Sequence, residues 1–333
     1  MSSLKNPFRI FLSLALLLVA GWAILMYSTQ NWFLFEENWF MTVTMIFGSF
    51  IAGASSEGGG AIAYPAMTLL FNIGPDVARN FSLAIQSFGM TFAAIWIFLS
   101  RIKIEKNYLL IAGLGGAIGI LFGTYFIVPL IKPSYAKMMF VSFWLSFGFA
   151  LWVVNFIRKR ESVEQLPVLS LYQKTELLVI GVLGGIFSSV FGNGIDICTF
   201  AFVVLKYGLS EKVATPTSVI LMASNAVIGA LLHTFVLDTM QAEAINYLLV
   251  CLPVVIFGAP LGAFVINQIG RKTIAVLLIT IIVVQFVTAL IIIQPSLLLL
   301  SFSLGIFLLG MIIFFLLTNF KPSWRKQGSV STK

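Results

Sequence analysis

The chain is poor in charged residues and in side chains that bind metals. Of its 333 residues only 10% are charged, against roughly a quarter in soluble domains. The single histidine, His233, excludes a multi-histidine metal site. The two cysteines, Cys198 and Cys251, both lie in apolar runs, which indicates neither a disulfide framework nor a metal cluster. We therefore expect no metal site and no cofactor.

The chain also lacks the motifs of two large functional classes. It contains no G-x-x-x-x-G-K-[ST] phosphate loop, so the sequence does not support an ATP-driven pump, although a separate ATPase subunit stays open. The net charge of +8 comes mostly from short loops and the tail. The positive-inside rule explains this excess, and we expect no nucleic-acid partner.

What the chain has in abundance is apolar residues, at 59% and a mean hydropathy of +1.03. A bilayer-spanning helix takes roughly 20 apolar residues. The pattern predicts an all-α polytopic protein of the cell (inner) membrane. Its lipid-spanning segments are Phe8–Tyr27, Phe81–Ser100, Tyr108–Leu130, Met138–Ile157, Thr217–Val236, Ala244–Ile266, Thr273–Ile293 and Leu297–Thr318.

Two further apolar segments, Trp39–Phe71 and Glu176–Lys206, are each interrupted by glycines near the middle. Basic clusters such as "RIKIEK" (Arg101–Lys106) and "RKR" (Arg158–Arg160) should face the cytoplasm, with both termini. Alternation of the spans then makes the first segment begin and end outside, and the second begin and end inside. We therefore expect eight full spans plus two hairpins that enter from opposite sides.

An internal repeat connects the two hairpins. Gly48–Ser82 aligns with Gly184–Ser218 without a gap, at one constant offset in residue number. Inverted repeats with interrupted helices are typical of secondary transporters, whose substrate site lies between the repeats. The predicted organisation is a first half at 1–157 (hairpin 39–71), a cytoplasmic linker at 158–175, a second half at 176–319 (hairpin 176–206) and a basic cytoplasmic tail at 320–333.

The glycines of each hairpin predict a sharp turn followed by a new short helix. In the first hairpin these are Gly58, Gly59 and Gly60, with the helix restarting at about Ala61; the second hairpin has "FGNGID" (Phe191–Asp196), which contains Gly192, Asn193 and Gly194. The N–H groups and the positive dipole end of such helices suit an anion. The alternative is that the glycines only allow close helix packing.

Neighbouring polar side chains are candidates for completing an oxyanion site, or alternatively for joining helices: Ser55, Ser56, Ser82, Gln86, Thr217, Ser218 and Asn225. Two carboxylates, Glu57 and Asp196, are candidate proton carriers, because intramembrane acids are costly and usually functional. They would instead be solvated if the hairpin tips reached the opposite interface. Arg79 is assigned to anion attraction at the outer mouth, or alternatively to interfacial anchoring, and His233 to a structural role.

Two paired motifs stand out: "SSEGGGAIAYP" (Ser55–Pro65) with "GPDVARNFSL" (Gly74–Leu83), and "GVLGGIFSSVFGNGIDICTF" (Gly181–Phe200) with "GLSEKVATPTSV" (Gly208–Val219). With these motifs the chain resembles the TauE/SafE family of sulfite exporters over about residues 38 to 293. The resemblance implies transport of sulfite, sulfoacetate or another organosulfonate, coupled to the proton gradient. Glu57, Asn193 and Asp196 depart from the family's more glycine-rich pattern.

We therefore expect a non-enzymatic secondary transporter for a small anionic substrate. A homo-oligomer in the bilayer is compatible with the sequence. The alternatives are a passive anion channel, a structural subunit or an intramembrane enzyme. The stretch "GASSEG" (Gly53–Gly58) argues against the enzyme, because Glu57 stands where a G-x-S-x-G motif needs its last glycine.

Overall fold

The computed structural model describes residues 5–55, 58–157 and 162–319. Within these ranges the regular elements are helices, apart from one isolated bridge between Val163 and Leu209. Nine of the helices in the described part are long and apolar enough to cross a membrane. The prediction of an all-α polytopic membrane protein is confirmed.

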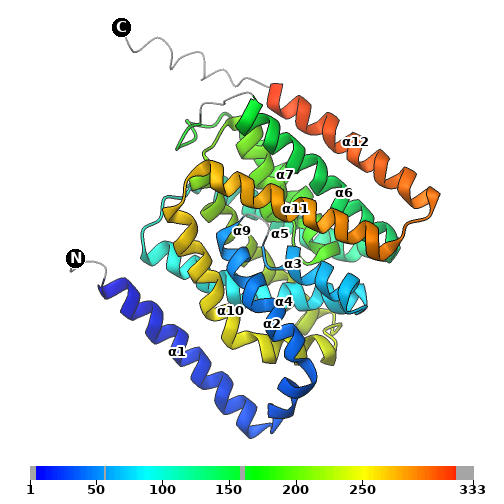
Figure 1. Ribbon diagram of the computed structural model, residues 1–333. Helices are drawn as coiled ribbons and strands as arrows, with labels where there is room; N and C mark the ends of the chain where they lie inside the picture. The colour runs from blue at the N-terminus through cyan, green and yellow to red at the C-terminus, as the bar shows by residue number, and fades with distance from the viewer. Residues whose placement is uncertain (1–4, 56–57, 158–161, 320–333) are drawn as a thin grey trace.

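The main helices follow one another without intervening domains (Figure 1). They are α1 (Lys5–Ser28), α2 (Leu34–Ala54), α3 (Gly60–Pro65), α4 (Pro75–Leu99), α5 (Lys106–Phe122), α6 (Pro133–Trp152), α7 (Leu171–Phe191), α8 (Ile195–Phe202), α9 (Glu211–Leu231), α10 (Ala242–Gln268), α11 (Arg271–Ile293) and α12 (Leu297–Asn319). Short 3-10 or π turns lie beside several of them: Asn31–Phe33, Ala66–Leu70, Gly123–Ile127, Val128–Leu130, Val153–Ile157, Val203–Tyr207 and Leu232–Val236.

The internal repeat extends well beyond the segment that the sequence alignment covers. Helices α4 and α9 begin at Pro75 and Glu211, and α5 and α10 begin at Lys106 and Ala242, so each pair keeps the offset of the aligned segment. The repeating unit is therefore α2–α6 in one half and α7–α11 in the other. Helices α1 and α12 stand outside it and lie on opposite edges of the bundle (Figure 1).

The two halves are inverted with respect to each other. The equivalent helices α4 and α9 pack side by side and run antiparallel. Leu83, near the start of α4, lies against Gly229 near the end of α9, whereas Ile97 and Thr215, at the opposite ends, line one cavity. An antiparallel pair of equivalent helices requires a pseudo-two-fold axis across the helix direction, which is the inverted repeat predicted above.

Each hairpin has one long arm and one short arm. The short arms are α3, of six residues, and α8, of eight residues, each followed by a π turn of five residues. At about 1.5 Å per residue they measure about 17 and 20 Å, too short for a hydrocarbon core of about 30 Å. The nine membrane-length helices are the eight predicted spans and α7, the long arm of the predicted second hairpin. This arm begins at Leu171 rather than at the predicted Glu176, because Ser170 and Gln173 form a capping box there.

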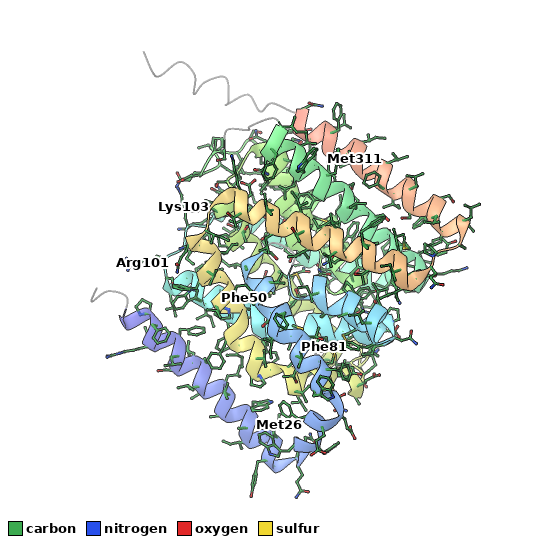
Figure 2. The ribbon with its side chains drawn as sticks, viewed as in Figure 1. Met26, Phe50, Phe81, Arg101, Lys103 and Met311 are labelled. Atoms are coloured by element: carbon green, nitrogen blue, oxygen red, sulfur yellow. The ribbon has the colours of Figure 1, made fainter. Side chains whose placement is uncertain are left out.

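The loop between α4 and α5 and the linker between the halves lie at the same end of the bundle. Figure 2 shows Arg101 and Lys103 on this loop. Lys103 pairs with Glu164 of the linker at 2.9 Å, and the Glu105 carboxylate accepts a hydrogen bond from the backbone of Leu166 at 3.1 Å. The α4–α5 loop and the described part of the linker are therefore held together.

The long arms pack on their neighbours with almost no space between backbones. A Cβ added at Gly119 of α5 would lie 2.0 Å from the Val182 carbonyl oxygen of α7. In the equivalent pair, a Cβ at Gly53 of α2 would lie 1.8 Å from the Ala259 carbonyl oxygen of α10. Small residues let membrane helices approach this closely. Each long arm is thus held against a neighbouring helix up to the point where its hairpin turns.

We expect Gly119→Ala to destabilise the protein by about 1–3 kcal/mol, because the added methyl group forces α5 and α7 apart. Thermal unfolding in detergent measures the effect as a lower melting temperature. Gly21→Ala on α1 is the matched control, since an added Cβ there meets nothing within 4 Å. Equal melting temperatures for the two variants would contradict the close packing.

Candidate functional site

The tips of the two hairpins meet in the interior of the bundle. A Cβ added at Gly58, in the first tip, would lie 2.6 Å from Asp196 Oδ2 of the second hairpin. It would lie equally close, at 2.6 Å, to Oε1 of Gln86 in the middle of α4. The structure therefore brings together three of the residues that the sequence analysis proposed, one from each hairpin and one from α4.

Glycine makes both breaks possible. The first tip turns at Gly58, with φ of 66°, before α3 begins at Gly60 rather than at Ala61. The second turns at Gly192 and Gly194, with φ of 78° and 146°. Glycine adopts these left-handed and related conformations without the steric cost that a Cβ brings. The proposals for Ser56 and Glu57 lie outside the described residues.

The first turn of α8 is hydrogen-bonded by the chain's own side chains. Asp196 Oδ1 accepts from the backbone N–H groups of Gly194 and Ile197, at 3.2 and 3.0 Å, and Ser188 Oγ accepts from that of Ile195 at 3.0 Å. The sequence predicts these N–H groups as the donors to an anion. In this structure a carboxylate of the protein occupies the position where such an anion would bind.

Gln86 connects α4 to the second tip. Its Nε2 donates to the carbonyl oxygens of Gly192 and Ser82, both at 2.8 Å. Its Oε1 and Asp196 Oδ2 are buried, and among the described residues neither has a hydrogen-bond partner. Leaving such acceptors unsatisfied is costly. Two acceptor oxygens thus approach Gly58 without a donor, which marks this point as one where a proton or a ligand donor would be stabilised.

Other predicted residues line the same region. Ser82 packs against Gly192, and its hydroxyl is buried with no partner in the described part of the chain. Gly59 lies against the aliphatic part of the Gln86 side chain. A Cβ added at Gly59 would lie 3.5 Å from Gln86 Cγ. Ser55 and Asn193 are fully buried at the ends of the two breaks.

Three predicted residues lie away from the tips or bond elsewhere. Thr217 donates to the Val213 carbonyl at 2.7 Å and accepts from the backbone of Glu105 at 3.0 Å, so it joins helices. Ser218 donates to a carbonyl of its own helix at 2.8 Å. Asn225 lies near Gly116 of α5, and its side-chain polar atoms have no partner among the described residues.

Arg79 sits at the start of α4, half-buried. Its Nε donates to Asn80 Oδ1 at 3.0 Å, and its backbone lies against Gly192. Nearby, His233 is 3% exposed, and its Nδ1 is 2.8 Å from Thr239 Oγ1.

Sequence reasoning missed two residues of the site. Ser188 bonds the start of α8, and Met222 of α9 lies 3.5 Å from the Cβ position of Gly58. Ser188 precedes the first glycine of its break by one helical turn, a spacing that places its hydroxyl beside the tip. Met222 stands at the repeat position of Gln86, which the constant offset between the halves could have shown.

We expect Gln86→Met to lower the stability of the protein by about 1–3 kcal/mol, since it leaves the Gly192 carbonyl without its donor. The change copies the residue at the equivalent position of the second half and keeps the side-chain length. Melting temperature is the measurement, and Gln268→Met, at an exposed end of α10, is the control. If both variants melt alike, Gln86 does not hold the second tip.

Comparison with known proteins gives one result. The family model described as "Sulfite exporter TauE/SafE" matches residues 2–146 and 41–289. No curated protein and no solved structure matches the chain significantly. The longer family match covers well over half of the 333 residues and includes both hairpins, α4 and α9. The chain therefore belongs to the TauE/SafE family of sulfite exporters, a family of membrane transporters.

Proposed function

We propose that the protein is a proton-coupled secondary transporter that moves a small anion, such as sulfite, sulfoacetate or another organosulfonate, between the hairpin tips. The observation that carries the proposal is the meeting of Gly58, Gln86 and Asp196 at the junction of the two inverted halves. In secondary transporters built this way the substrate site lies between the repeats.

The contacts of Asp196 suggest how an anion and a proton are linked. The carboxylate holds the first turn of α8 through the N–H groups of Gly194 and Ile197. A substrate oxyanion needs the same donors, because N–H groups at a helix start bind negative oxygens. Protonation of Asp196 removes its charge and weakens its hold on those donors. A proton on Asp196 and an anion at α8 therefore favour each other.

The wider arrangement supports alternating access. Each long arm is locked against a helix of the other half, α2 against α10 and α7 against α5, so in this proposal each of these pairs moves as one unit. Rocking of the two units about the tips, where α4 and α9 both approach Gly58, exposes the site to each side in turn. In this proposal the protein is a multi-pass protein of the cell (inner) membrane with both termini in the cytoplasm, and it acts without catalysis.

We expect Asp196→Asn to abolish the response of anion flux to an imposed pH gradient, while downhill flux continues. Asparagine can still accept the two N–H bonds but cannot exchange a proton. Flux into proteoliposomes with and without the gradient is the measurement. Asp238→Asn is the matched control, since Asp238 is exposed and its positive φ of 49° suits asparagine.

If Asp196→Asn kept the full response to the pH gradient, Asp196 would not be the proton carrier, and Glu57 would be the next residue to test. A wild-type flux that ignores the pH gradient would instead favour the passive channel.

We expect Gly58→Ala to reduce anion flux at least about tenfold while the protein still reaches the membrane. The methyl group would lie against Asp196 and Gln86 and would strain a left-handed backbone by about 1–2 kcal/mol. A proteoliposome screen of sulfite, sulfoacetate, other sulfonates and simple carboxylates identifies the transported anion. Gly74→Ala is the control, because its added Cβ meets nothing within 4 Å. Undiminished flux in Gly58→Ala would place the anion elsewhere.

A further inference from the structure

An apolar groove opens where the start of α1 meets the ends of α4 and α10. Its volume is about 350 Å³, far more than the roughly 30 Å³ that one water molecule takes up in the liquid. The described residues that line it carry no charge, and they include Phe8, Phe11, Trp96, Phe257, Leu261 and Phe264. Phe8 and Leu261 are each 53% exposed, so the groove is open to the surroundings of the bundle.

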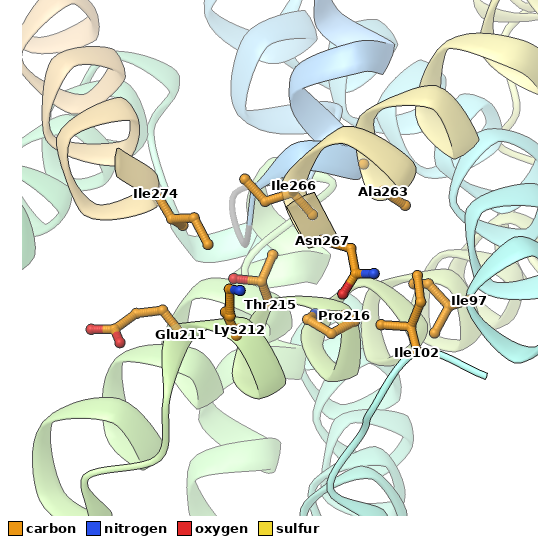
Figure 3. Close-up of a pocket in the computed structure, with 11 residues that line it drawn as sticks. Ile97, Ile102, Glu211, Lys212, Thr215, Pro216, Ala263, Ile266, Asn267 and Ile274 are labelled. Carbon is orange, nitrogen blue, oxygen red and sulfur yellow. The ribbon is translucent and has the colours of Figure 1, made fainter. Parts of the chain in front are cut away.

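The groove lies on the outside of the helix bundle. Figure 3 shows Ile97 of α4 and Ala263 of α10 beside an inner space that the buried Glu211 also lines. Trp96 and Phe264 are their direct neighbours in the sequence and line the groove instead, because successive residues of a helix point in different directions. All three helices of the groove are long and apolar enough to cross a membrane. The open side of the groove therefore meets the hydrocarbon core of the bilayer.

Helix α1 is hydrogen-bonded to the bundle at the end away from the groove. There Trp22 donates its indole N–H to the Leu249 carbonyl oxygen at 2.8 Å. At the groove, α1 is held by ring contacts, with 5.5 Å between the ring centroids of Phe11 and Trp96. Of the nine membrane-length helices in the described part, α1 has the smallest buried share. An apolar occupant of the groove would therefore add contacts between α1 and the bundle at this end.

The end of the bundle at which α1 begins and α4 and α10 finish is positively charged. The stretches 5–28, 85–104 and 253–272 form the groove and continue to that end, and they contain no aspartate or glutamate. Their basic residues are Lys5, Arg9, Arg101, Lys103, Arg271 and Lys272, of which Lys103 pairs with Glu164. Arg9 follows Phe8 directly, Arg101 follows Trp96 by little more than one helical turn, and both arginines are exposed. Figure 2 shows Arg101 at this edge of the bundle. A negatively charged group is therefore favoured next to the groove.

An apolar chain joined to a negative headgroup is the chemistry of an anionic phospholipid. The positive-inside rule assigns this end of the bundle to the cytoplasm, whose leaflet carries the anionic lipids. Basic pockets between membrane helices on that side bind such headgroups. A zwitterionic lipid would fill the groove but has no net charge to match. A second copy of the chain, packed symmetrically on this face, would bring the same arginines together, which the repulsion of like charges disfavours.

We propose that the groove binds one acyl chain of an anionic phospholipid from the cytoplasmic leaflet, with the lipid phosphate beside Arg9 and Arg101. The bound lipid fills the opening between α1, α4 and α10 and holds the start of α1 against the bundle. The lipid site is separate from the hairpin tips, and it does not depend on the proposed transport function.

The first test compares lipids that differ only in headgroup charge. Phosphatidylglycerol and phosphatidylcholine with the same acyl chains are added to the purified protein in detergent. We expect phosphatidylglycerol to raise the melting temperature at least about 2 °C more than phosphatidylcholine does. The double variant Arg9→Gln/Arg101→Asn should lose this difference, and asparagine suits the positive φ of 53° at Arg101. Lys174→Gln, at an exposed position of α7, should keep it. The proposal is overturned if wild type responds alike to both lipids, or if the double variant still prefers phosphatidylglycerol.

The second test fills the groove with a larger side chain. Leu261→Trp does so at a half-exposed position, and Leu304→Trp on α12, where Leu304 is 57% exposed, is the matched control. Native mass spectrometry measures the phosphatidylglycerol that stays bound to the protein. We expect wild type and Leu304→Trp to retain bound lipid and Leu261→Trp to lose it.

Equal retention of phosphatidylglycerol by all three proteins would overturn the groove as the lipid site. A change of oligomeric state in Leu261→Trp with unchanged bound lipid would identify a second copy of the chain as the occupant and would also overturn the proposal. Should Leu261→Trp fail to fold, the double variant of the first test decides.

Discussion

The structure depends on one constraint, which is that backbone N–H and C=O groups need partners wherever water is excluded. The chain nevertheless interrupts two helices inside the bundle. It meets the constraint by burying the two breaks against each other and supplying partners from side chains. Asp196 and Ser188 accept from the start of α8, and Gln86 donates to Gly192 at the end of α7. In the proposed transport function, the polar groups that stabilise the breaks are also the ones that bind the ion.

The same constraint explains why the site needs both halves. Gln86 belongs to α4 of the first half, but the carbonyl that it binds belongs to the second hairpin, 106 residues away. Gly58 of the first hairpin faces Asp196 of the second. Because Gln86 and the break that it stabilises come from opposite repeats, a displacement of one half changes the hydrogen bonding of the second tip. This property suits a transporter that exposes one site to two sides.

The two halves share a backbone plan but differ in chemistry at equivalent points. The short arm of the first hairpin is tied to its long arm by Phe40 and Phe71, whose ring centroids are 4.5 Å apart. At the equivalent positions of the second half, Tyr207 donates to the Glu176 carboxylate at 2.8 Å, and Lys206 pairs with the same carboxylate. The two arms of each hairpin are therefore joined at equivalent positions in both halves. The first half uses an aromatic contact there, and the second half uses a hydrogen bond and an ion pair.

The sequence by itself determined the membrane class, the positions of both breaks and the inversion of the halves. Long apolar runs, glycines and loop charges act locally, and the constant offset of the repeat is visible in the chain. Only the tertiary structure decided how the polar residues are used. It placed Asp196 on the α8 N–H groups and added Ser188 and Met222 to the site. It also joined Thr217 to the distant backbone of Glu105 and gave Ser218 to a local bond. A hydrogen bond depends on which distant group arrives within about 3 Å, and no local pattern contains that distance.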